Sequence, residues 1–167
     1  MINSIINANA YLGTNKLAGK LDELELPAVK LKTQEVTALG IYGTTEIPCG
    51  LEKMEAKFKW NAIYADEWKK ESPMQTTRVI VKSNMMVVDA SGVKKNAKVT
   101  ATIGGLFKEL PTGSVKPGEK MDGAEHLMTV TYYKLEVDSD EVYEIDVLNN
   151  IFKQGGKDLL SDFNNNQ

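Results

Sequence analysis

The chain has 167 residues, 26% of them charged and 42% hydrophobic, and a net charge of −3. This length and composition fit one soluble domain, residues 1–167, with a core of its own. The small negative charge excludes a strongly basic nucleic-acid-binding protein. The single cysteine, Cys49, excludes an internal disulfide framework and favours assembly in a reducing cytoplasm. No stretch approaches the roughly 20 apolar residues that span a bilayer, so we expect no membrane anchor.

The N-terminal arm, residues 1–12, is poor in charge and carries Ile2, Ile5 and Ile6. Because such an arm is costly to leave in water, we expect it either to pack on its own domain, as an ordinary first strand would, or to lie on a neighbouring molecule. In residues 21–32, apolar and acidic positions alternate until Pro27. This pattern predicts a strand, an edge or bend at the proline, and a second short strand.

Residues 34–50 contain three glycines and one proline, with Ile41, Tyr42 and Ile47 between them. They predict the first of two long loops, and apolar residues exposed on a long loop suggest that something binds over them. The alternative is a loop folded back on its own sandwich.

Residues 51–60 show the clearest strand pattern, because Met54, Ala56, Phe58 and Trp60 alternate with charged residues. The period then changes within residues 61–71, where Tyr64 and Trp68 are four apart and share one helical face. Pro73 ends this segment, so we expect one short helix packed on a sandwich.

Residues 78–88 and 97–103 are β-rich and flank a turn at 89–92, which predicts a hairpin. Gly104 and Gly105 then predict a bulge or a strand end. Residues 108–125, with two prolines and three glycines, predict the second long loop, mobile alone and ordered by a partner. This loop includes Leu110, Val115 and Lys116.

A C-terminal hairpin is predicted by two β-rich runs, residues 127–137 and 142–147, on either side of an acidic turn. In the second run Tyr143, Ile145 and Val147 alternate with acidic residues, so one face is apolar and the other mostly acidic. A glycine turn and a short helix-like piece, residues 157–163, complete the chain. The sum is a mainly β protein with six to eight strands: an antiparallel β-sandwich or barrel with one short flanking α-helix and two long loops.

No known catalytic, zinc-binding or phosphate-binding motif is present, so we expect no catalytic residue, no metal ligand and no cofactor. Glu144 and Asp146 could resemble a paired-acid site, but a solvated acidic face is the preferred interpretation because no third group converges on them. With one histidine and one cysteine, a zinc site is not expected. His126, at the end of a flexible loop, is interpreted as incidental.

The order of residues near the C-terminus resembles the signature of the major tail tube proteins of contractile-tailed phages. The matching pieces are Tyr132-Tyr133-Lys134-Leu135, the acidic turn, Glu144-Ile145-Asp146, Asn149 with Ile151, and Gly156-Lys157-Asp158-Leu159. Elsewhere the similarity is one of element order, and the N-terminal arm lacks the basic residues that many relatives carry.

This resemblance implies a β-sandwich of which six copies form a ring, with rings stacked into a hollow tube inside a contractile sheath. The implied partners are further copies of the chain, the sheath protein, tail-end and baseplate proteins, and phage DNA that passes through the lumen without specific binding. The implied location is the virion, after assembly in the bacterial host cytoplasm. One alternative is the tube of a headless contractile particle, a bacteriocin or secretion system; another, from a different class, is a monomeric ligand-binding β-sandwich.

Two sets of residues follow as hypotheses. An acidic lumen would repel phosphate groups, so we expect that some of Glu136, Glu144 and Asp146 face the lumen. The two long loops, 34–50 and 108–125, are expected to reach neighbouring subunits through the residues Ile41, Tyr42, Ile47, Leu110, Val115 and Lys116.

Overall fold

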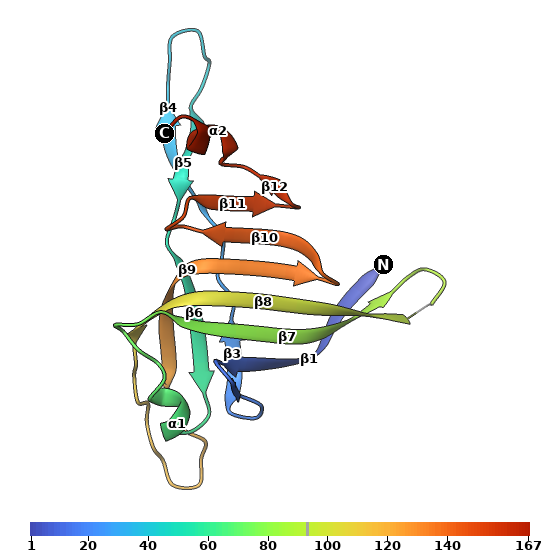
Figure 1. The fold of residues 1–167 in the computed structure, drawn as a ribbon, viewed down its shortest axis with the longest axis vertical. Coiled ribbons are helices and arrows are strands. Elements are labelled where there is room, and N and C mark those ends of the chain that lie inside the picture. The colour runs from blue at the N-terminus through green and yellow to red at the C-terminus, as the bar shows by residue number, and fades with distance from the viewer. Residues whose placement is uncertain (93) are drawn as a thin grey trace.

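A computed structural model describes residues 1–92 and 94–167 (Figure 1). The described residues form twelve strands and two short helices, which confirms a mainly β, antiparallel fold with more strands than expected. The strands are β1 Ile2–Leu12, β2 Asn15–Lys16, β3 Leu21–Glu25, β4 Leu31–Val36, β5 Thr45–Leu51, β6 Met54–Trp60, β7 Thr77–Val88, β8 Lys94–Glu109, β9 Glu125–Val137, β10 Asp140–Asp146, β11 Ile151–Gln154 and β12 Lys157–Asp158. The helices are α1 Ala65–Trp68 and α2 Ser161–Asn165, and neither is long and apolar enough to cross a membrane.

The main sheet has the strand order β12-β11-β10-β9-β8-β7-β1-β2. A second layer branches from it at β9, because β9 changes partner along its length. Residues 125–130 of β9 pair with β6, which also pairs with β3, whereas residues 132–137 pair with β10. Figure 1 shows β6 and β3 running across the long strands of the main sheet. The two layers are therefore joined through one continuous strand, as in sandwiches whose strands pass from one sheet to the other.

The predicted irregularity at Gly104 and Gly105 is a shift in register between β8 and β9. A Cβ atom placed on Gly105 would lie 2.0 Å from the carbonyl oxygen of Thr129, so only glycine fits this close approach of the two backbones. Beyond this point β8 and β9 leave the main sheet and enter the second layer. A bulge with glycine is a common way to bend a strand pair in this manner.

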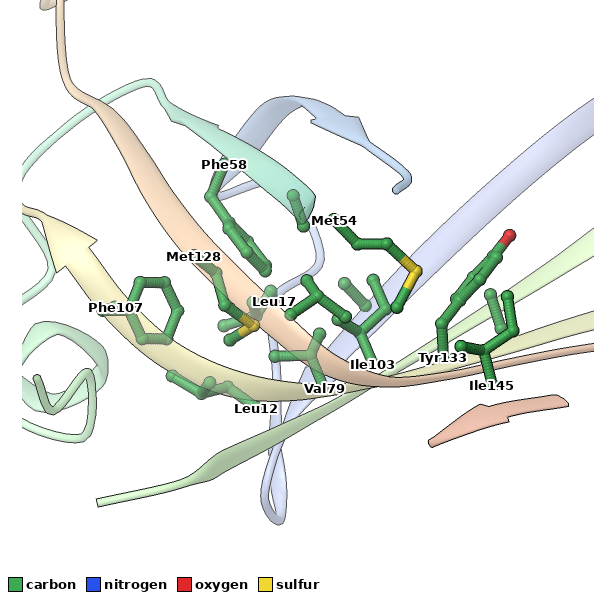
Figure 2. Close-up of a cluster of buried hydrophobic side chains, with 14 of the residues drawn as sticks. Leu12, Leu17, Met54, Phe58, Val79, Ile103, Phe107, Met128, Tyr133 and Ile145 are labelled. Atoms are coloured by element: carbon green, nitrogen blue, oxygen red, sulfur yellow. The ribbon is translucent and has the colours of Figure 1, made fainter. Parts of the chain in front are cut away.

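The core lies between the two layers (Figure 2). From β6 the alternating residues Met54, Phe58 and Trp60 are buried, as predicted. They meet side chains from the main sheet, among them Ile103 and Ile145, which are fully buried. The predicted helix is confirmed, although it is short, and its Trp68 ring packs 6.1 Å from the ring of Trp60.

Residues 34–50 are not one long loop. β4 and β5 pair as an antiparallel hairpin, which leaves residues 37–44 as its loop. The glycine and proline residues of this stretch predicted a loop where the structure has two strands. Pro48 and Gly50 lie in β5 beside a shift in register, and the hairpin forms a separate two-stranded sheet. Both residue types are tolerated at bulges and on strands with a free edge.

The C-terminal hairpin has the predicted strands but a tighter turn. Asp138 and Ser139 have φ angles of 50° and 71°, which is the backbone of a two-residue turn that matches the twist of the flanking strands. The Asp138 carboxylate accepts a hydrogen bond from the backbone N–H of Lys98, at 2.8 Å. The turn is thereby held against β8.

Candidate assembly surfaces

The outer edge of β1 is open along most of its length. β7 pairs with the other edge of β1 from end to end, whereas β2 covers only its last two residues. Among the described residues, no strand pairs with this outer edge at residues 2–9. Ile2, Ile5 and Ile6 on this segment are 73%, 62% and 54% exposed. The arm is thus a first strand whose inner half joins the core, while its outer half is a long apolar edge of the kind that pairs with other chains.

The opposite border of the main sheet is short. β12 has two residues, which pair with the end of β11, and α2 follows it. The amide of Asn164 in α2 donates to the carbonyl oxygen of Asn150, at 3.0 Å, which links α2 to the turn after β10. This border carries four exposed apolar side chains, Val147, Leu148, Leu159 and Phe163. The two borders of the sheet differ in shape, as required for a head-to-tail contact between identical copies.

The three carboxylates that we expected to face a lumen lie on one face of the main sheet. They are Glu136 on β9 and Glu144 and Asp146 on β10. Cross-strand register places Lys134 opposite Glu144 and Tyr132 opposite Asp146. Ile145, which alternates with the two acids of β10, is fully buried. The carboxylates therefore point away from the core, on the outer face of the sheet.

The acidic face predicted for β10 is joined by cations from β9 and β7, so this face of the main sheet is mixed in charge. The Nζ atom of Lys134 lies 3.0 Å from Oε1 of Glu136 and 3.9 Å from Oε2 of Glu141. The guanidinium of Arg78, on β7, lies 5.3 Å from the centre of the Tyr132 ring. Neighbouring strands thus place cations beside the acids, and opposite charges across strands stabilise a sheet.

Asp146 has a second role, in the turn that follows β10. Its carboxylate accepts hydrogen bonds from the backbone N–H of Asn149, at 3.2 Å, and from the side-chain amide of Asn149, at 2.7 Å. Side chains of this type commonly fix turns in this way. Two residues of the C-terminal signature therefore define the turn between β10 and β11.

The loop end of the β4–β5 hairpin projects beyond α2 and the rest of the chain (Figure 1), and the two strands pair only with each other, while Leu51 at the base of the hairpin packs against the core. Tyr42 at its tip is fully exposed, and Ile41 and Ile47 are about half exposed. Leu31 and Leu39 on the same hairpin are exposed as well. Apolar side chains gathered on a projecting hairpin mark it as a contact surface.

The loop between β8 and β9, residues 110–124, is closed at its base and exposed at its tip. Ser114 and Asp122 exchange two backbone hydrogen bonds of 2.6 and 3.3 Å. Ala124 is buried and accepts a hydrogen bond from the backbone N–H of Trp60, at 3.0 Å. Of the residues that we expected to contact neighbours, Leu110 is 40% and Val115 is 78% exposed, and Lys116 is exposed as well. The base of this loop is thus held by the chain itself, contrary to the expectation of a loop that only a partner orders.

His126 is a buried structural residue, so its interpretation as incidental is wrong. It is 1% exposed and packs against the Trp68 ring at 4.6 Å between ring centres. Its Nδ1 atom is hydrogen-bonded to the carboxyl group of Glu71, and its Nε2 atom lies 3.0 Å from the carbonyl oxygen of Pro111. Burial raises the pKa of Glu71, and the bond to the imidazole acts in the opposite direction. His126 lies two residues before Met128 in β9, and residues two apart in a strand share one face. This spacing was the signal in the sequence that His126 faces the core.

Two hollows on the described surface are small. Their volumes are ≈ 110 and ≈ 140 Å³, below the range of about 300–1,000 Å³ that is typical of ligand pockets. The smaller one is lined by side chains of both charges, Glu23, Glu25, Lys57, Lys59 and Glu125. Within residues 1–92 and 94–167, no three His, Cys, Asp or Glu side chains gather in a way that could hold a metal ion.

Comparison with known proteins gives one consistent result. Residues 2–166 match the family model described as phage tail tube protein FII. The chain is 28% identical over 154 residues to the major tail tube protein of Serratia phage KSP20, covering 90% of this chain and 85% of that protein. It is 25% identical over 170 residues to the tail tube protein of Escherichia phage P2, covering 99% of this chain and 94% of the relative.

Proposed function

The chain belongs to the phage tail tube protein FII family, and on this premise we propose that six copies close into a ring and that the rings stack into the hollow tube of a contractile tail. The family makes it a structural component of the phage tail and not an enzyme. The observation that carries the proposal is the open border of the main sheet at β1. A chain that folds alone with such an edge is prone to pair with other chains, and closing the edge against a second copy removes this hazard.

In the proposed ring, the β1 edge of one copy meets the border formed by β12 and α2 in the next copy. Both borders carry exposed apolar side chains, so the contact buries apolar surface on each side. A head-to-tail contact uses two different surfaces and leaves each free to repeat. The main sheets of successive copies would then form one continuous barrel wall, in which no strand edge is left unpaired.

Stacking of rings is assigned to the two projecting segments. The hairpin of β4 and β5 and the loop at 110–124 extend from opposite ends of the molecule in Figure 1. A segment that projects along the tube axis can reach the ring above or below. Ile41, Tyr42 and Ile47 in the first segment, and Leu110, Val115 and Lys116 in the second, are the proposed contact residues.

The outer face of the main sheet is proposed to line the lumen, with Glu136, Glu144 and Asp146 among its side chains. Lys134 forms an ion pair with Glu136, so on this face a cation that could bind phosphate is held by a carboxylate. Contacts from unpaired lysine and arginine to phosphate dominate affinity for DNA. The pairing of Lys134, together with the repulsion of phosphate by the three carboxylates, would let DNA pass without specific binding.

The remaining proposed partners are the sheath protein outside the tube and the tail-end and baseplate proteins at its ends, with assembly in the host cytoplasm. A tube of the same architecture in a headless contractile particle is the alternative within this class. The small volumes of the surface hollows disfavour the other alternative, a monomeric ligand-binding sandwich.

The test of the proposal is electron microscopy of the purified full-length chain, with size-exclusion chromatography of the same sample. We expect rings or tubes with six-fold symmetry. A monomer of 18.5 kDa at all protein concentrations and ionic strengths would refute it. In a reconstruction of the tube, finding the three carboxylates on the outer wall would refute the assignment of the lumen while leaving the ring intact.

The stacking role of the 110–124 loop can be tested by shortening its tip, with urea unfolding of the variant as a check because Met121, one of the residues removed, packs against the core. Replacing residues 115–121 by Asn-Gly keeps the pairing of Ser114 with Asp122, because a two-residue turn can join two antiparallel positions. We expect a folded protein that forms single rings but no long tubes. Tubes of normal length would show that this loop is not the stacking element.

A further inference from the structure

The imidazole of His126 faces a hydrogen-bond acceptor on each side. The carboxyl group of Glu71 meets Nδ1, and the carbonyl oxygen of Pro111 lies 3.0 Å from Nε2. A neutral imidazole carries one N–H and therefore donates to only one of them. Both contacts form in two cases: either Glu71 is protonated and donates to Nδ1 while Nε2–H donates to Pro111, or an imidazolium donates to both oxygens. In each case the pair holds one proton more than a carboxylate and a neutral imidazole.

We propose that Glu71 and His126 form a proton-dependent latch on the 110–124 loop, closed at Pro111 while the two side chains share this proton and open when it is lost. Without that proton, a neutral imidazole must point a lone pair either at the Glu71 carboxylate or at the Pro111 oxygen. In a buried site, an unpaired polar contact of this kind is costly. The latch concerns folding within one chain, so it does not rest on the formation of tubes.

The charged groups on the neighbouring elements are turned away from the pair or are paired elsewhere. From α1, Glu67 bonds to Lys20, and from β8, Lys108 bonds to Glu55. The lysines of β6 lie on its other face, because they alternate with its buried aromatic residues. Within β9, Glu125 also points away from the core and pairs with a lysine of β6, at 3.7 Å. The faces turned toward the imidazole are aromatic, from Trp60 and Trp68.

The direction of the pH effect follows from the burial of Glu71, which raises the pKa of its carboxyl group above 4.5. A group with a raised pKa in the folded state contributes stability that is complete at low pH and is lost as the pH rises through that pKa. The latch is therefore closed on the acidic side. Between the pKa of the open state and the raised pKa of the closed state, each pH unit weakens the closed state about tenfold.

Hydrogen exchange of the full-length chain from pH 5 to 10, corrected for the intrinsic exchange rate, tests the latch at the backbone amides of Ser114 and Asp122. In the wild type we expect protection that falls by about tenfold per pH unit between the pKa of the open state and that of the closed state. In Glu71→Gln we expect constant protection, because the amide donates to Nδ1 at every pH and leaves Nε2–H for Pro111. The matched control is Glu119→Gln, the same chemical change on an exposed loop residue, which should behave as the wild type.

Nitrogen NMR of the imidazole gives a second readout, which reports on the protons of the ring directly. His126 is the only histidine of the chain, so ¹⁵N-histidine labelling reports on one ring. We expect a proton on Nε2 throughout the closed state, and in Glu71→Gln a fixed neutral tautomer with the proton on Nε2. A wild-type ring with the proton on Nδ1 alone at low pH would overturn the latch. So would loop protection that does not change over this pH range, or that changes equally in wild type and Glu71→Gln.

Discussion

Gly105 is the position at which one added methyl group has the largest calculable effect. In Gly105→Ala the new Cβ would lie 2.0 Å from the carbonyl oxygen of Thr129, where ordinary contact begins at 3.4 Å, and 3.0 Å from the Cα of Val130. Both neighbours are backbone atoms, so relief requires that β8 and β9 move apart. We expect a cost of about 2–4 kcal/mol, from about 1–3 for overpacking and about 1 for the loss of one ladder hydrogen bond.

The assay is urea unfolding of the full-length chain, followed by tryptophan fluorescence, because Trp60 and Trp68 both pack against the core. The matched control is Gly104→Ala, whose Cβ would meet only the side-chain Cβ of Tyr132, at 3.3 Å. We expect the control to lose less than about 1 kcal/mol. Equal losses in the two variants would refute the reasoning, because they would mean that the strand pair adjusts freely at the bulge.

Three further outcomes are expected. Ile47→Ser, at an exposed position of the β4–β5 hairpin, should change the free energy of unfolding by no more than about 0.5 kcal/mol yet shorten or abolish tubes in electron micrographs; normal tubes would remove the hairpin from the contact surfaces. Ile103→Ala, at a fully buried position, should lower the free energy of unfolding in urea by about 2–5 kcal/mol. A smaller decrease would mean that neighbouring side chains move in and fill the cavity. The hydrogen bond from Lys20 lowers the pKa of Glu67 below its ordinary value of 4.5. The wild type should therefore be more stable than Lys20→Met above pH 4.5, and this difference in unfolding free energy should shrink as the pH falls through the lowered pKa. A difference that persists in acid would contradict this.

Local patterns predicted those parts of the fold that depend on neighbours in sequence. The alternation in β6 and the turn residues of the C-terminal hairpin each specify structure within a dozen residues, and both predictions are confirmed. The prediction of a loop at 34–50 was wrong because proline is tolerated on a strand with a free edge and glycine at a bulge. Neither residue type reveals whether an edge is free, since that depends on the rest of the sheet.

The candidate surfaces could be predicted only in part, for a related reason. The acidic character of β10 is visible in its own sequence, but Lys134 and Arg78 reach the same face through cross-strand register and a ring contact with Tyr132. Glu71 and His126 are 55 positions apart, and nothing local marks them as partners. Contacts of this range follow from the strand order, which single-strand patterns do not determine.

β9 belongs to both layers, and this has a mechanical consequence. Its first half is held between β6 and β8, and its second half between β8 and β10. A pull on either layer is therefore transmitted along one covalent backbone to the other, and neither layer can peel away while its counterpart stays intact. The subunit should therefore yield as a whole under load and not one layer at a time.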